Sequence, residues 1–242
     1  MIPFVHPHQF VARGMRDAPV HHHLRETVSA IDYRLGFPGQ CSRKPGLDMF
    51  IPDDSASVTV PGGSDPIASR YSEVKAAVIK VGQWCHCKQC IAAIIHFDTP
   101  TSGDVPPTVI KGRRGQALLK HGLIVPSDAS GASVLGPSLT RAEEMASEYP
   151  SHDVRLTILT DWQLFDSDLR DLPNRLHRFP GHVLCVGLGW SPPVELKADN
   201  TSLATIAYKD PLGTVARAVF NQITRDRVRR RVLPPHGMRS QP

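Results

Sequence analysis

Five oxygen-bearing side chains in this sequence have the types and the spacing to bind a metal ion. Asp53, Ser55 and Ser57 alternate after an apolar run, in "FIPDDSAS". Ser133 lies in a hydroxyl-rich loop, "PSDASGASVLGPSL", and Asp161 ends the run "VRLTILTD". An all-oxygen set suits a hard cation such as Mg²⁺, with Mn²⁺ or Ca²⁺ as alternatives. Because three of the ligands are neutral hydroxyls, the bound cation would stay electrophilic and could accept a further carboxylate.

These side chains can meet only if their segments reach one edge of a sheet. Six apolar runs of strand length are bounded by Gly, Pro, Asp or Ser, as strands usually are. Strands alternating with helices predict an α/β fold, a Rossmann-like, doubly wound, mainly parallel sheet with helices on both faces. In such a sheet, functional residues gather beyond the carboxyl ends of the strands. The six runs are "LDMFI", "IAAIIHF", "TVI", "VRLTILT", "HVLCVGL" and "LATIAY".

Apolar residues repeating at three and four positions predict the helices between these runs. They occur over Tyr71–Trp84, Leu139–Tyr149 and Phe165–Phe179, where Pro173 would split the helix, and again from about Gly213. No helical pattern occupies "DTPTSGDVPP", between the second and third apolar runs. This predicts a hairpin there and one antiparallel edge strand.

At 242 residues the chain suits one large domain with extensions. We expect a partly irregular N-terminal extension over residues 1–44, with a short helix around Leu24–Tyr33. The α/β domain would span residues 45–232, and a basic, disordered tail residues 233–242.

The net charge of +5 owes much to six arginines between Arg225 and Arg239. We interpret them as the solvated face of a last helix and its frayed end. Contact with nucleic acid or an acidic partner is the alternative.

Five cysteines are present, and three of them, Cys85, Cys87 and Cys90, crowd into "CHCKQC". This spacing, without a second pair at zinc-finger distance, predicts neither a disulfide framework nor a four-ligand zinc site. Cys41 and Cys185 are too isolated in sequence to be assigned as partners. We interpret "CHCKQC" as a turn between a helix and a strand with reduced thiols, and a metal or redox role is the alternative.

An apolar content of 40% allows a real core and excludes a wholly disordered chain. No apolar run approaches the roughly 18 residues that span a bilayer, and the first residues have no signal-peptide core. We therefore expect a cytoplasmic protein without membrane contact.

Three elements together resemble the metal-ion-dependent adhesion site (MIDAS) of von Willebrand factor type A (vWA) domains. Asp53-x-Ser55-x-Ser57 matches the first motif of that family, at the end of the first strand. Ser133 stands where the family has a Thr in a Gly-rich loop before a helix. Leu159-Thr160-Asp161 matches the family's strand-terminal "LTD". The resemblance covers roughly residues 45–232.

The resemblance implies the vWA fold and a metal site made by these five residues. It also implies a non-catalytic role, in which the cation binds a Glu or Asp of a partner protein. In bacterial members of the family the partner is often an AAA+ ATPase or another co-encoded component.

The sequence departs from the family pattern in several places. Asp54 and Ala56 stand at the variable positions of a motif that commonly reads D-x-S-G-S, and Ser133 lacks the methyl group of Thr. The loop after Ser57 is longer than usual. Asp54 or Asp128, if either faces the site, would tighten metal binding and weaken the attraction for an acidic ligand.

Two other functions remain open from the residues alone. A metal, an acid and a hydroxyl at a strand end could hydrolyse a phosphate ester. However, "DDSAS" lacks the D-x-D-x-T/V spacing of such phosphatases, and the chain has no G-x-S-x-G or G-x-x-x-x-G-K-[ST] motif. A nucleic-acid-associated protein would use the arginines, yet no aromatic residues are interleaved with them. We therefore expect a non-enzyme.

Overall fold

The computed structural model describes residues 33–59, 63–65, 70–97 and 99–227. All of them lie in one compact unit, Asp32–Pro242. The predicted helix around Leu24–Tyr33 therefore lies outside the described residues except for Tyr33, and so do the predicted tail and most of the arginines. The proposed domain boundaries stay predictions.

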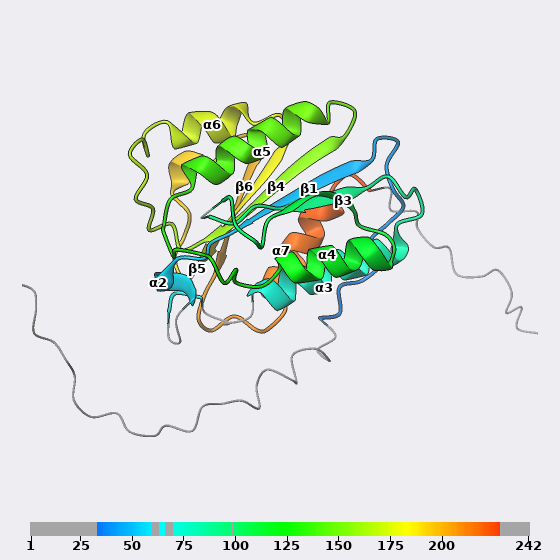
Figure 1. Ribbon diagram of the computed structural model, residues 1–242, viewed down its shortest axis with the longest axis horizontal. Coiled ribbons are helices and arrows are strands. Elements are labelled where there is room, and N and C mark those ends of the chain that lie inside the picture. Colours follow the sequence, from blue (N-terminus) through cyan, green and yellow to red (C-terminus); the bar gives the residue numbers. More distant parts are fainter. Residues whose placement is uncertain (1–32, 60–62, 66–69, 98, 228–242) are drawn as a thin grey trace, which may run out of the picture. The chain divides into compact units, whose positions relative to one another are not determined.

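The sheet has six strands in the order β3-β2-β1-β4-β5-β6 (Figure 1). Every neighbouring pair is parallel except β2 and β3, which are antiparallel at the edge. Each predicted apolar run forms a strand, and the mainly parallel sheet with one antiparallel edge strand is confirmed. The strands are β1 (Gly46–Pro52), β2 (Ile91–Ile94), β3 (Val105–Val109), β4 (Asp153–Thr160), β5 (His182–Leu188) and β6 (Thr201–Ile206).

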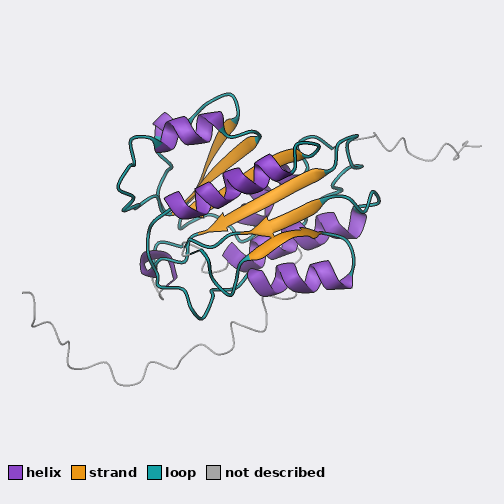
Figure 2. Ribbon diagram, turned by 45° about the horizontal axis from the view of Figure 1, so that its top comes forward, coloured by secondary structure: helices purple, strands orange, loops and turns teal. Residues whose placement is uncertain are grey.

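Helices cover both faces of the sheet. On one face lie α5 (Gly136–Glu148) and α6 (Leu172–Arg178), and on the other α3 (Arg70–Trp84), α4 (Arg113–Gly122) and α7 (Thr214–Ile223) (Figure 1 and Figure 2). Two short elements complete the described fold, the helical turn α2 (Ala56–Thr59) and the 3₁₀ turn η2 (Val194–Leu196). None of the helices in this part of the chain is both long and apolar enough to cross a membrane.

Alternation along the strands divides the core between the two faces. Leu47, Met49 and Ile51 of β1 pack with Leu139 and Met145 of α5 in one buried cluster. The intervening β1 residues face the other helices, which is why this central strand is buried along its whole length and mostly apolar, apart from Asp48, which pairs with Arg155. This rigid centre fixes where the carboxyl ends of β1 and β4 lie.

Two helices differ from the sequence prediction. The predicted helix over Phe165–Phe179 begins only at Leu172, with Pro173 in its first turn. Proline has no N–H to donate and is well tolerated there, so it starts this helix rather than splitting it. The helix α4 was not predicted, because its buried side comprises Gly115, Leu119 and Gly122, too few large apolar residues to give a clear period.

Candidate metal site at the carboxyl edge of the sheet

The loop after β1 presents the first three predicted ligands. Asp53 is fully buried, and its Oδ1 accepts a hydrogen bond of 2.7 Å from the backbone N–H of Ser55. The hydroxyl oxygens of Ser55 and Ser57 lie 3.1 Å apart. The turn α2 follows at once, with the backbone N–H groups of Val58 and Thr59 donating to the carbonyl of Ser55. The turn therefore holds the alternating carboxylate and hydroxyls together.

The end of β4 brings Asp161 to the same edge. Because β1 and β4 are parallel neighbours in register up to Pro52 and Leu159, the residues that follow them emerge side by side. The hydroxyl of Thr160 donates to Asp53 Oδ2 at 2.5 Å and links the two strand ends. Asp161 Oδ2 accepts a hydrogen bond of 2.7 Å from the hydroxyl of Ser64, and both residues are buried.

The loop containing Ser133 lies between these two segments. The carbonyl of Gly131 accepts a hydrogen bond from the N–H of Ala56, and that of Ser133 accepts one of 2.8 Å from the N–H of Phe165. Ser133 itself is buried. Backbone hydrogen bonds thus tie this loop to the segments that follow β1 and β4, which carry the other four predicted ligands.

The electrostatics at this edge favour a cation. Burial raises the pKa of Asp53, and the nearby charge of Asp161 adds to the increase against the opposing effect of hydrogen bonds from Ser55 and Thr160. Each hydrogen-bonded carboxylate oxygen still has a second lone pair for a metal. A divalent cation would offset the repulsion between the two acids, so the donor set fits a hard, oxygen-seeking ion.

Sequence reasoning missed two residues that hold these acids. Thr160 fixes Asp53, and Ser64 fixes Asp161 from the long loop after Ser57. Such supporting partners orient metal ligands and tune their affinity. The signal for Ser64 in the sequence was the unusual length of its loop.

Asp54 and Asp128 are hydrogen-bonded to residues other than the predicted ligands. Asp54 Oδ2 lies 2.7 Å from His96 Nδ1, and its Oδ1 accepts a hydrogen bond from the hydroxyl of Tyr71. Asp128 accepts hydrogen bonds from both the backbone N–H and the hydroxyl of Ser102. Both carboxylates are engaged by other residues, and that of Asp54 is paired with a histidine ring.

The cysteines require a correction. The sequence predicted no four-ligand set, and Cys41 was left without a partner. In the structure Cys41 lies with Cys85, Cys87 and Cys90, and the four sulfur atoms are within 4.8 Å of one another. The spacing of cysteines along the sequence could not predict this group, because only the folding of the chain brings Cys41 beside the other three. The turn between a helix, α3, and a strand, β2, is as predicted.

Comparisons with known proteins establish the fold. No protein-family model and no curated protein sequence matches the chain. Among solved structures, a von Willebrand factor type A protein from Catenulispora acidiphila has a TM-score of 0.54 at 18% identity, over 76% of this chain and 43% of that one. The pilus adhesin SpaC from Lactobacillus rhamnosus GG, in its open conformation, has a TM-score of 0.53 at 12% identity, over 78% of this chain and 30% of that one.

A third structure, proximal thread matrix protein 1 from the mussel byssus, has a TM-score of 0.50 at 15% identity, over 76% of this chain and 48% of that one. The chain thus corresponds to less than half of each of these three. Together with the strand order, these likenesses show that the chain has the vWA fold.

Proposed function

We propose that this chain is a metal-dependent protein-interaction module. Its site would bind Mg²⁺, or Mn²⁺ or Ca²⁺, through Asp53, Ser55, Ser57, Ser133 and Asp161. The bound cation would then take a Glu or Asp side chain from a partner protein. The observation that carries the proposal is the placement of two buried carboxylates, Asp53 and Asp161, beside paired hydroxyls at one edge of the sheet.

The site is accessible from one side. Asp53 and Ser55 are buried, whereas Ser57 is exposed. An incoming carboxylate would therefore approach from the side of Ser57. Mg²⁺ usually retains positions for water or for a ligand from a partner, and three neutral hydroxyls leave it positive enough to attract an acid.

The same edge carries exposed aromatic side chains. Phe165, Trp190 and Tyr208 follow β4, β5 and β6, and their exposed fractions are 78%, 60% and 64%. A Cβ added at Gly189 would lie 2.7 Å from the carbonyl oxygen of Ser64 and 3.2 Å from the Tyr208 hydroxyl, so these loops pack together. Aromatic residues are enriched in protein interfaces, and they would supply the apolar contacts around the metal.

A binding role fits this site better than hydrolysis. His96, which pairs with the residue next to Asp53, is fully buried with both ring nitrogens engaged, by Asp54 and by the carbonyl of Gly122. It therefore cannot act as a general base for a water at the metal. As the first partners to test we propose co-encoded proteins with an exposed acidic residue, an AAA+ ATPase among them.

The test is a thermal melt in metal-depleted buffer without chelator, before and after addition of Mg²⁺ or Mn²⁺. A cation that binds only the native state raises its stability by mass action, by about 2.7 kcal/mol at 100 times Kd. We expect this gain in the wild type and in Asp128→Ala, whose carboxylate is hydrogen-bonded to Ser102, but not in Asp53→Ala or Asp161→Ala. A gain that survives in both site variants would place the cation elsewhere and reject the proposal.

A further inference from the structure

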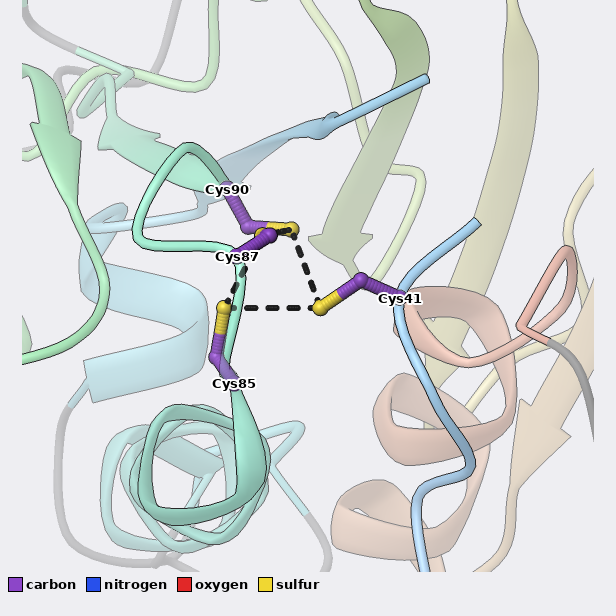
Figure 3. Close-up of side chains that lie close together, drawn as sticks. All are labelled: Cys41, Cys85, Cys87 and Cys90. Atoms are coloured by element: carbon purple, nitrogen blue, oxygen red, sulfur yellow. Dashed lines mark hydrogen bonds between the residues drawn. The ribbon is translucent and has the colours of Figure 1, made fainter. Parts of the chain in front are cut away.

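Four cysteines from two separate segments converge at the amino edge of the sheet (Figure 3). Cys41 precedes β1, Cys85 follows α3, and Cys87 and Cys90 lie in the turn before β2. Consecutive sulfur–sulfur distances around the group are 3.6 Å for Cys41 to Cys85, 3.4 Å for Cys85 to Cys87, 3.3 Å for Cys87 to Cys90 and 3.9 Å for Cys90 to Cys41.

These distances match a tetrahedral metal site. Four sulfurs each 2.3 Å from a central zinc ion would lie about 3.8 Å from one another. A disulfide needs about 2.05 Å, and all four thiols are free. A cluster of several irons would spread its ligands farther, because each cysteine would bind a different iron. The arrangement therefore suits one ion with four thiolate ligands.

The surroundings of the sulfurs fit bound thiolates. The backbone N–H of Gln89 donates to Cys87 Sγ at 3.5 Å, after a turn in which Lys88 has φ +57°. Arg227 is only 7% exposed, and its Nη2 lies 4.0 Å from Cys90 Sγ. Its Nη1 is buried without a hydrogen-bond partner. A zinc ion with four thiolates carries a charge of −2, which would compensate this buried guanidinium.

We infer that Cys41, Cys85, Cys87 and Cys90 bind one zinc ion in a closed, structural site. Four protein ligands leave no position for a substrate, so the ion would stabilise the folded chain. It would fasten residues 33–44 to the turn between α3 and β2. Contact between the rings of Phe37 and Trp84, 5.2 Å apart, joins the same two segments.

This site is independent of the proposed function. The cation site lies at the carboxyl end of β1 and the cysteines at its amino end, so seven residues of strand, or about 20 Å, separate the two. Strong chelators would remove zinc from the cysteines, which is why the Mg²⁺ experiment uses chelator-free buffer.

The first test uses the wild-type chain, purified in reducing buffer without chelator or histidine tag. We expect one zinc per chain by elemental analysis and four sulfur neighbours near 2.3 Å by X-ray absorption at the zinc edge. Replacement by Co²⁺ should give the absorption of a tetrahedral tetrathiolate. Zinc-free protein that also fails to bind Co²⁺ would overturn the inference, as would a disulfide among these cysteines or iron in place of zinc after growth in zinc-replete medium.

The second test changes one cysteine at a time to serine. Cys41→Ser is the sharpest variant, because Cys41 is remote in sequence, and we expect zinc affinity to fall at least tenfold, with a lower melting temperature. Cys185→Ser is the matched control, since Cys185 is a free, buried cysteine within β5. Equal zinc affinity in Cys41→Ser and the wild type would reject the four-ligand site. If Cys41→Ser does not fold, the number of sulfur neighbours of zinc in the wild type still shows whether four cysteines bind the ion.

Discussion

The carboxylate of Asp54 lies 2.7 Å from Nδ1 of His96, and neither side chain is exposed to solvent. Nε2 of the same ring lies 2.9 Å from the carbonyl oxygen of Gly122. Because a carboxylate and a carbonyl only accept hydrogen bonds, both ring nitrogens must donate, and His96 is an imidazolium. The charge of Asp54 is thereby balanced within the fold, which leaves Asp53 and Asp161 as the acids of the candidate metal site.

This ion pair predicts a pH-dependent stability. Burial alone would lower the pKa of His96, but the hydrogen bond and charge of Asp54 outweigh it, with help from Asp104, and raise that pKa above 6.5. The stabilisation is then fully present below pH 6.5 and is lost as the pH rises through the raised pKa. Tyr71 also stacks on the ring, with the ring centres 6.3 Å apart, and the charge of His96 helps to lower the pKa of Asp128.

The measurement is urea unfolding of the wild type and His96→Gln from pH 5.5 to 9. We expect the variant to lose about 3–5 kcal/mol below pH 6.5, as for other broken buried pairs, and the difference to shrink at higher pH. His121→Gln, a change at an exposed position of α4, serves as control. A difference between wild type and His96→Gln that does not vary with pH would contradict the charged pair.

Ser64→Ala should weaken binding of the cation without removing a predicted ligand. Its hydroxyl holds Asp161 Oδ2 at 2.7 Å, and loss of such a supporting partner typically costs about 10–100-fold in metal affinity. Calorimetric titration with Mg²⁺ or Mn²⁺ checks this. Ser102→Ala removes a similar bond, to Asp128, and should leave affinity unchanged. Equal affinities in all three proteins would mean that Ser64 does not position Asp161.

Trp190→Ala should separate partner binding from metal binding. Trp190 is 60% exposed at the proposed interface, and interface aromatics often contribute 2 kcal/mol or more, about 30-fold in affinity. We expect weaker Mg²⁺-dependent binding of an acidic partner but an unchanged thermal shift with Mg²⁺. Leu118→Ala, at an exposed apolar residue of α4, is the control. If Trp190→Ala and Leu118→Ala bind the partner equally, Trp190 lies outside the interface.

Glu73→Gln should destabilise the fold. Glu73 is fully buried, and its two carboxylate oxygens accept hydrogen bonds from the backbone N–H groups of Gly213 and Ala216, at 2.7 Å and 3.0 Å. An amide can accept only one of these, so one buried N–H loses its partner at a cost of about 1–3 kcal/mol. Urea unfolding checks this against Glu148→Gln, an exposed helix position that should change stability by less than about 0.5 kcal/mol. Equal unfolding of the two variants would show that α7 does not depend on Glu73.

Much of the fold was predictable because its signals are local. Each strand is an apolar run with clear ends, and "DTPTSGDVPP" lacks a helical period, so the hairpin with its antiparallel edge strand followed directly. Asp53, Ser55, Ser57 and Asp161 were found because they immediately follow such runs. By contrast, α4 was missed because glycines form much of its buried side: a Cβ at Gly115 would meet the carbonyl oxygen of Val109 at 1.9 Å.

The sequence alone determined which residues follow each strand, and with them the acids and hydroxyls of the candidate cation site. Only the tertiary structure decided what those residues touch. His96 meets Asp54 across 42 positions, and Cys41 meets Cys85 across 44. Both encounters depend on the parallel pairing of β1 with β2, which sets the residues before and after one strand beside those of the other. Periodicity describes one segment at a time, so it cannot show which distant side chains the sheet brings together.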